Sequence, residues 1–173
     1  MTSACSSALF RNLPAVAAGP TLDVLGATVE ILSTCGETCV IRGVVQPGVV
    51  VPMHRHEDPE DFYVLAGSKE VLIPQGGGLA WVSVHPGDYI KVPGNAVHAH
   101  RNVSHEPVID LIITTARMGR FFTEVGRPLT DPPTPPTPEQ LAMFMRKSAE
   151  YGHTLCSAEE NAAYGINVPP FSM

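Results

Sequence analysis

The sequence predicts an all-β barrel or sandwich followed by a short C-terminal helical extension. Short β-rich runs follow one another from Leu22 to Thr115, and glycines and prolines separate them at close, regular spacing. No stretch of this region is long enough to suggest a crossover helix, so the sheets should be antiparallel. After Thr115 the pattern changes to helical periodicity and a proline-rich connector.

Nine runs make up the expected barrel. Pairs such as Pro47-Gly48, Pro86-Gly87 and Pro93-Gly94 supply the restricted or left-handed backbone conformations that tight turns need. The expected strands are Leu22–Leu32, Thr38–Val45, Val49–Met53, Asp61–Leu65, Lys69–Ile73, Leu79–Val84, Tyr89–Val92, Val97–Asn102 and Val108–Thr115.

The C-terminal part is expected to form three short helices. Met118–Val125 is the first of them. Thr137-Pro138-Glu139-Gln140 combines an N-cap, a proline at the first helical position and a capping-box residue, which predicts a helix to about Tyr151. Ser157 and Glu160 repeat the capping-box spacing before a last short helix. Docking of these helices on the barrel and packing on a partner subunit are both open.

Length and composition indicate one domain with a tail. The 173 residues are 44% hydrophobic and 16% charged, which favours a packed core. The expected parts are an N-terminal arm (1–21), the barrel (22–127), a proline-rich connector (128–138) and a helical tail (139–173). The formal net charge of -6 argues against nucleic acid as a partner.

Membrane insertion and secretion are not expected. No stretch of about 18 apolar residues occurs, and the N-terminal segment lacks a basic region before an uninterrupted apolar one. The four cysteines form no zinc-type pattern, so free thiols in a cytoplasmic protein are favoured. Cys35 and Cys39 flank a turn, and whether they pair stays open.

The histidines mark the chemistry, because six of the seven lie between His54 and His105. Side chains alternate along a strand, so His54 and His56 point to the same side. On a second strand pair, Glu60 and His98 can meet them, and three imidazoles with one carboxylate suit a divalent first-row metal. A single His-x-His on a strand is more often a pair of surface or core histidines than a pair of metal ligands. Here two separate segments of the predicted barrel both supply candidate ligands, which favours a metal site.

The two segments read Gly48-x5-His54-x-His56-x3-Glu60-x6-Gly67 and Gly87-x5-Pro93-x4-His98-x3-Asn102. They resemble the two signature motifs of the cupins, G-x5-H-x-H-x3,4-E-x6-G and G-x5-P-x-G-x2-H-x3-N. One position departs, because Asn95 stands where the second motif has a glycine. Asparagine tolerates left-handed backbone conformations, so we expect the turn to survive.

The resemblance implies a double-stranded β-helix, the cupin jelly-roll barrel, as a small single-domain protein similar to quercetinase-like dioxygenases. It implies that His54, His56, Glu60 and His98 are the metal ligands. Iron, manganese or nickel is the expected ion, and zinc, cobalt and copper fit the same ligands. The resemblance also implies a homodimer, which would cover an exposed sheet edge.

Two residues are candidates for catalysis. His100 shares a strand face with His98, so it should look into the barrel as an acid or base, although a hydrogen-bonded structural histidine is an equal alternative. Manganese cupin hydroxynitrile lyases look similar in having a histidine at this position. Glu60 combines the roles of ligand and base, because a carboxylate that weakens its metal bond gains basicity.

Four further residues are candidates for the substrate pocket. Phe62 and Val64 share the strand face of Glu60 and should be lumen walls. Asp110 interrupts an apolar strand and is costly to bury unpaired, so a partly solvated or salt-bridged position is its alternative. Arg42 would bind an acidic substrate or extend outward into solvent.

Cupin identity fixes a fold and a metal site better than a reaction. The leading hypothesis is a metal-dependent dioxygenase, an oxidoreductase acting on a small enolisable or aromatic substrate. The alternatives are a non-oxidative lyase, isomerase or cyclase that uses His100, and a non-catalytic cupin that binds a small molecule. His85, His105 and His153 are expected to be exposed bystanders.

Overall fold

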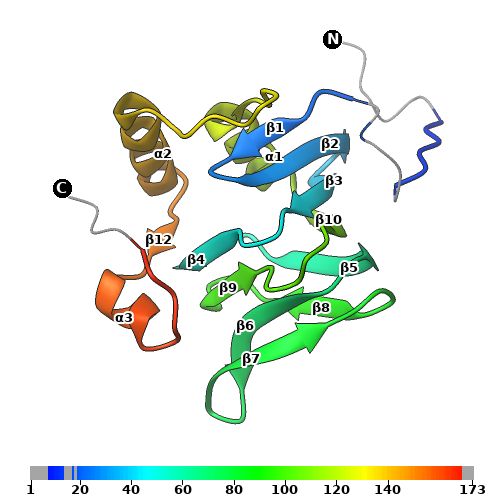
Figure 1. Ribbon diagram of the computed structural model, residues 1–173. Coiled ribbons are helices and arrows are strands. Elements are labelled where there is room, and N and C mark those ends of the chain that lie inside the picture. The colour runs from blue at the N-terminus through cyan, green and yellow to red at the C-terminus, as the bar shows by residue number, and fades with distance from the viewer. Residues whose placement is uncertain (1–7, 14–16, 18, 169–173) are drawn as a thin grey trace.

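The computed structural model describes residues 8–13, 17 and 19–168, which form a barrel of two facing sheets (Figure 1). Within this part of the chain, one sheet consists of β1 (Leu22–Val24), β2 (Ala27–Cys35), β3 (Thr38–Val45), β5 (Glu60–Ala66), β8 (Tyr89–Val92), β10 (Val108–Thr115) and β11 (Arg127–Pro128). Its strand order is β11-β1-β2-β3-β10-β5-β8.

The facing sheet, again within the described residues, consists of β4 (Val50–Arg55), β6 (Lys69–Gln75), β7 (Gly78–Val84), β9 (His98–Arg101) and β12 (Thr154–Leu155). Its strand order is β12-β4-β9-β6-β7. All the strand pairs described are antiparallel, as the sequence predicts.

Apolar side chains from the two sheets meet in the core between them. Ile41, Val64 and Val108 come from one sheet and Val71 from the other, and all four are fully buried. Burying a side chain of this size contributes about 1.5–3 kcal/mol, so the alternating pattern of these strands holds the sheets together. The barrel prediction is confirmed.

The first predicted strand is divided. Leu22–Leu32 is interrupted at Leu25 (φ 54°) and Gly26 (φ 101°), which form a tight turn between β1 and β2. The Asp23 carboxylate accepts a hydrogen bond from the Gly26 N–H at 2.7 Å and stabilises this turn. The sequence analysis missed it because Leu25 is apolar and reads as strand.

Helix α1 (Ala116–Val125) follows β10 directly. Thr115 caps it, because its side chain accepts a hydrogen bond from the Met118 N–H. Helix α2 (Pro138–Glu150) begins at the predicted capping box of Thr137 and Gln140. The two helices pack through aromatic rings, with Phe121 centred 6.0 Å from Phe144 and 5.4 Å from Tyr151.

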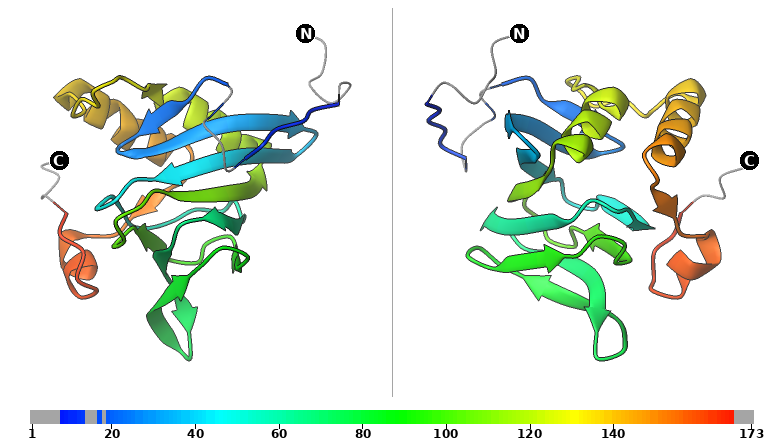
Figure 2. Two further views of the ribbon diagram at one scale, coloured as in Figure 1. Left: turned by 45° about the vertical axis from the view of Figure 1, so that its right-hand side comes forward. Right: turned by 180° about the vertical axis from the view of Figure 1, so that it is seen from behind.

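The tail docks on the barrel of the same chain, which is one of the two arrangements that the sequence leaves open. Strand β12 pairs with β4, and helix α3 (Ala158–Ala162) follows with the predicted Ser157–Glu160 capping box. Figure 2 shows α2, β12 and α3 along one side of the barrel. No helix in the described ranges combines the length and the hydrophobicity that crossing a bilayer requires.

The cysteines differ in state. Cys39 and Cys156 are free thiols, whereas Cys35 is disulfide-bonded. Cys35 and Cys39 therefore do not pair with each other, and the expectation of free thiols is wrong for Cys35. Cys5 lies outside the described residues.

Candidate metal centre and adjoining cavity

Three histidines converge at one end of the barrel. His54 on β4 lies opposite His98 on the neighbouring strand β9, and their ring centroids are 4.2 Å apart. His56 stands one residue beyond the end of β4, with its ring 5.1 Å from that of His98. One ring nitrogen from each of the three lies within 4.8 Å of the others, so together they can hold a metal ion.

Backbone carbonyls orient all three rings. A carbonyl oxygen can only accept, so each Nδ1 carries the hydrogen and each Nε2 keeps its lone pair free for a metal. The three hydrogen bonds run from His54 to Pro52 O at 2.7 Å, from His56 to Asp58 O at 2.8 Å and from His98 to Ala96 O at 2.9 Å.

Glu60, at the start of β5, brings a carboxylate to the same place. Its Oε2 is 3.5 Å from His56 Nε2 and 3.4 Å from His98 Nε2. Burial alone would raise the pKa of Glu60, but the contacts with His56 and His98 outweigh it and hold that pKa well below its usual range. His98 Nε2 is buried without a hydrogen-bond partner among the described residues, as expected of an atom that faces an ion.

The turn at Pro93-Gly94-Asn95 supports the centre. A Cβ on Gly94 would lie 2.2 Å from the Glu57 carbonyl oxygen, so only glycine allows this approach. Asn95 adopts the expected left-handed conformation (φ 66°), and its N–H donates to the His56 carbonyl at 2.6 Å. The departure from the second motif thus leaves the turn intact.

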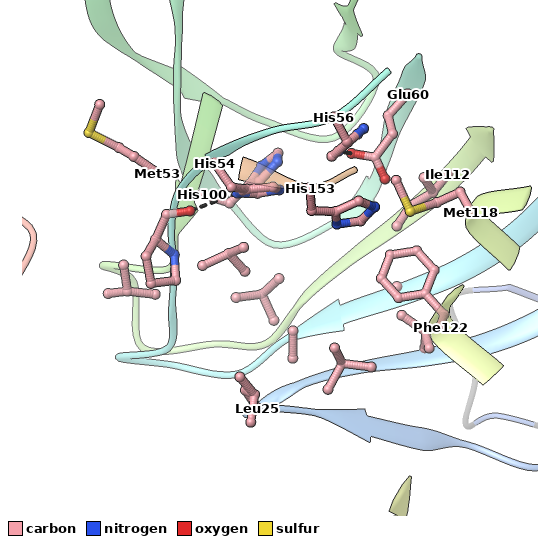
Figure 3. A pocket seen from close by; sticks show the side chains of 18 of the residues that line it. Leu25, Met53, His54, His56, Glu60, His100, Ile112, Met118, Phe122 and His153 are labelled. Atoms are coloured by element: carbon pink, nitrogen blue, oxygen red, sulfur yellow. Dashed lines mark hydrogen bonds and ion pairs between the residues drawn. The ribbon is translucent and has the colours of Figure 1, made fainter. Parts of the chain in front are cut away.

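A cavity of about 170 Å³ adjoins the histidines. Its walls are mostly apolar, and Figure 3 shows Ile112, Met118 and Phe122 facing the metal centre across it. An apolar cavity of about 150 Å³ accommodates a benzene molecule, so this one suits a substrate the size of one aromatic ring.

His100 and Phe62 stand in the cavity wall, as the strand parity predicts. Their rings are 4.7 Å apart, and the ring of His98 is 5.7 Å from that of His100. His100 Nδ1 is buried and has no hydrogen-bond partner among the described residues. Burial and then the nearby Lys69 charge hold the pKa of His100 well below its ordinary value, so its imidazole is neutral.

Asp110 lies in the same wall, bound to a residue that the sequence analysis missed. Lys69 Nζ donates to Asp110 Oδ2 at 2.5 Å, and both residues are buried. Lys69 shares a strand face with Val71 and Ile73, so strand parity could have indicated its inward direction. Its pairing with Asp110 joins strands of opposite sheets, so no local sequence pattern indicates it.

Two predicted pocket residues lie elsewhere. Arg42 points to the outer face of its sheet, where its Nε donates to the Leu13 carbonyl at 2.7 Å, and it is not part of the cavity wall. The substrate-binding prediction for Arg42 is corrected on this ground. Val64 points inward but is packed in the core between the sheets, away from the cavity.

His153, expected to be exposed, is instead part of the cavity wall. The tail carries its ring to 4.8 Å from that of His56 and 4.1 Å from that of Phe121. Burial, and then the neighbouring His56, lower the pKa of His153 to about 4. Its local sequence reads as a turn, so only the docking of the tail reveals this position.

Comparison with known proteins agrees with this geometry. Residues 42–114 match the family model for the cupin domain. The match covers less than half of the chain but includes the three histidines and Glu60, so this part of the chain resembles a cupin domain. A search of curated proteins found no match.

Solved structures are similar in fold. KdgF from Halomonas sp. is 20% identical with a TM-score of 0.54, over 66% of this chain and 99% of that one. TT1209 from Thermus thermophilus is 20% identical with a TM-score of 0.51, over 61% and 95%. The DMSP lyase DddQ from Ruegeria pomeroyi is 24% identical with a TM-score of 0.42, over 47% of this chain and 40% of that one. At these identities the first two support the fold alone.

Proposed function

We propose that this protein is a metal-dependent enzyme that removes a proton from a small, largely apolar substrate, which then reacts with dioxygen. His54, His56, His98 and Glu60 are the proposed ligands. Three imidazoles and one carboxylate leave two positions of an octahedral ion free. A bound ion supplies a Lewis acid for a substrate oxygen and, when it is iron, manganese or nickel, a redox centre for dioxygen chemistry.

The observation that carries the proposal is the state of His100. A neutral imidazole whose Nδ1 has no hydrogen-bond partner among the described residues, in the wall of an apolar cavity next to the metal centre, is free to accept a substrate proton there. Phe62 packs against its ring and limits its movement. Glu60 keeps its negative charge at the centre, as a proposed metal ligand must, because the contacts with His56 and His98 hold its pKa low.

Deuterium exchange tests the proton step without dioxygen. We expect the zinc-loaded protein to exchange the methyl protons of acetophenone in D2O under anaerobic conditions, measured by NMR. His100→Ala should slow this exchange by about 10²–10⁴-fold while the zinc content stays the same. His105→Ala changes an exposed histidine and is the matched control. Equal exchange rates in His100→Ala and the unchanged protein would remove His100 from the mechanism.

Oxygen uptake tests the second step. Protein loaded with iron(II), manganese(II) or nickel(II) should consume dioxygen in the presence of enolisable aromatic ketones, followed with an oxygen electrode. Absence of uptake with all three metals, in protein that still exchanges acetophenone protons, would reject the dioxygenase.

The non-oxidative alternative is favoured by the same histidine, because proton transfer at His100 also serves a lyase, isomerase or cyclase. Exchange without oxygen uptake would support this class. Absence of both exchange and uptake would instead support a cupin that binds a small molecule without converting it.

A further inference from the structure

Lys69 and Asp110 form a buried ion pair that bridges the two sheets inside the barrel. Lys69 begins β6 of one sheet, and Asp110 lies on β10 of the other. The two side chains are 1% and 2% exposed. Taking two charges out of water costs several kcal/mol per ion, and apolar residues of similar size often stabilise such a position equally well or better. Stability alone therefore does not account for the pair.

The pair has hydrogen-bonding capacity that the protein leaves unused. Asp110 Oδ1 is buried and has no hydrogen-bond partner among the described residues. The Lys69 ammonium has three N–H donors, and its one hydrogen bond within the described chain goes to Asp110 Oδ2. Leaving a buried acceptor without a donor costs about 1–3 kcal/mol, which a ligand that supplies the donor would recover.

The pair belongs to the same cavity as His100. Both of its residues are in the cavity wall. Lys69 Nζ lies 4.8 Å from the centre of the Phe62 ring, and the same ring is centred 4.7 Å from that of His100. A molecule in the cavity can therefore reach the pair at one end and the metal centre at the other.

We propose that the Lys69–Asp110 pair is a second recognition point of the substrate and binds a hydroxyl group at the end remote from the metal. A hydroxyl donates to Asp110 Oδ1 and accepts from Lys69, so it uses both free capacities. A carboxylate would be repelled by Asp110 and an ammonium by Lys69. This inference rests on the proposed function, because it describes the substrate of the proposed enzyme. That substrate is a hydroxylated molecule about the size of one aromatic ring.

Calorimetry with phenol and toluene tests the proposal. The two probes have nearly the same shape and differ in the hydroxyl group. In the zinc-loaded protein, the ratio of phenol affinity to toluene affinity should fall about tenfold when Lys69→Met and Asp110→Leu are combined. We expect this double variant to fold, because apolar side chains replace the whole pair. An unchanged ratio would overturn the proposal.

A second ion pair, formed by the residues that follow Lys69 and His100 in sequence, is the matched control. Arg101 Nε and Glu70 Oε2 are 2.6 Å apart, and neither residue is part of the cavity wall. The double variant Glu70→Leu and Arg101→Met should leave the phenol-to-toluene ratio unchanged. A similar fall in this control would show that the ratio follows general destabilisation and would reject the proposal.

Asp110→Asn gives a second, nearly isosteric test. It removes the negative charge and keeps an acceptor, so benzoate should bind at least tenfold more tightly while phenol binding is retained. Unchanged benzoate affinity would contradict recognition at this pair.

Measurement of the same ratio in His98→Ala separates this inference from the proposed function. A pair-dependent ratio that persists in this variant would show that the recognition point does not need the metal centre. If the unchanged protein then shows neither deuterium exchange nor oxygen uptake, only the enzymatic proposal is rejected. A ratio that does not depend on the pair, in protein that exchanges acetophenone protons, would reject only the recognition point.

Discussion

At the scale of single residues, hydrogen bonds to backbone carbonyls fix which ring nitrogen of each histidine faces the metal centre. Because Pro52, Asp58 and Ala96 each accept a hydrogen bond from a histidine Nδ1, the three Nε2 atoms face one another before any ion arrives. Such fixed orientation lowers the entropy lost on binding and favours one coordination geometry.

Removal of one imidazole should therefore abolish tight metal binding. We expect His98→Ala to lower zinc affinity by at least about 100-fold, because loss of a ligand should exceed the 10–100-fold typical of a residue that only orients one. Metal content after dialysis, measured by mass spectrometry, checks the change. His85→Ala alters an exposed histidine away from the cavity and should keep its zinc. Full zinc retention by His98→Ala would contradict the proposed ligand set.

The sequence predicted those residues whose geometry is local. His54, His56 and Glu60 are close in sequence, and strand parity with the two motifs fixes their direction. The role of Lys69, by contrast, depends on its ion pair with Asp110 on the opposite sheet. His153 lies about 100 residues after His54 in sequence and reaches the site only because the tail docks on the barrel. For Arg42 the sequence left two directions open, because strand parity gives two faces and does not say which one the barrel encloses.

At the scale of elements, Asn161 on α3 fastens the tail to the strand that carries His54. Its Oδ1 accepts from the Met53 N–H at 2.9 Å, and its Nδ2 donates to the carbonyls of Cys156 at 3.1 Å and Ser157 at 3.0 Å. The side chain is fully buried, so these hydrogen bonds are shielded from solvent.

Asn161→Ala should destabilise the protein by about 1–3 kcal/mol, because it removes the acceptor of the Met53 N–H and the side-chain donor to the Cys156 carbonyl. The Ser157 carbonyl keeps its hydrogen bond from the backbone N–H of residue 161. Urea denaturation measures the loss, and faster hydrogen exchange at the Met53 amide should accompany it. Glu159→Ala, at an exposed position of the same helix, is the control. Unchanged exchange at Met53 would show that the tail does not depend on this contact.

The junction of α1 and α2 should depend on pH. Lys147 and the Tyr151 hydroxyl both bind Glu124 and lower the pKa of its carboxyl group. A depressed pKa in the folded state stabilises the fold above the unfolded pKa, and this contribution disappears as the pH falls through the folded value.

Glu124→Gln should therefore lower the melting temperature slightly at pH 7 and leave it unchanged in acid, below the pKa values of both states. Thermal unfolding at the two pH values measures the difference. A difference that persists in acid would mean that the carboxylate charge is not the cause.

At the scale of the whole molecule, the periodicity of two in the strands suffices to predict two facing antiparallel sheets, and the capping boxes predict the starts of α2 and α3. Periodicity does not predict the packing of the tail on β4, because this packing depends on contacts between distant parts of the chain.

The homodimer stays a prediction, as does the cytoplasmic location. Light scattering should give a mass of twice 18.5 kDa at micromolar concentration. The outer face of β5, β8 and β10 carries Tyr63, Tyr89 and Ile113, which are 43%, 59% and 41% exposed. Exposed apolar patches of this kind often mark interfaces. A mass of 18.5 kDa at all concentrations would contradict the dimer.

The pairing of β12 with β4 also sets the order in which the site is completed during synthesis. Arg55 pairs with Thr154, so the outer edge of the strand that carries His54 stays open until the ribosome has added the tail. All four proposed ligands are synthesised by residue 98. Domains fold as their residues emerge, so a nascent barrel could take up its ion while one wall of the cavity has yet to be translated.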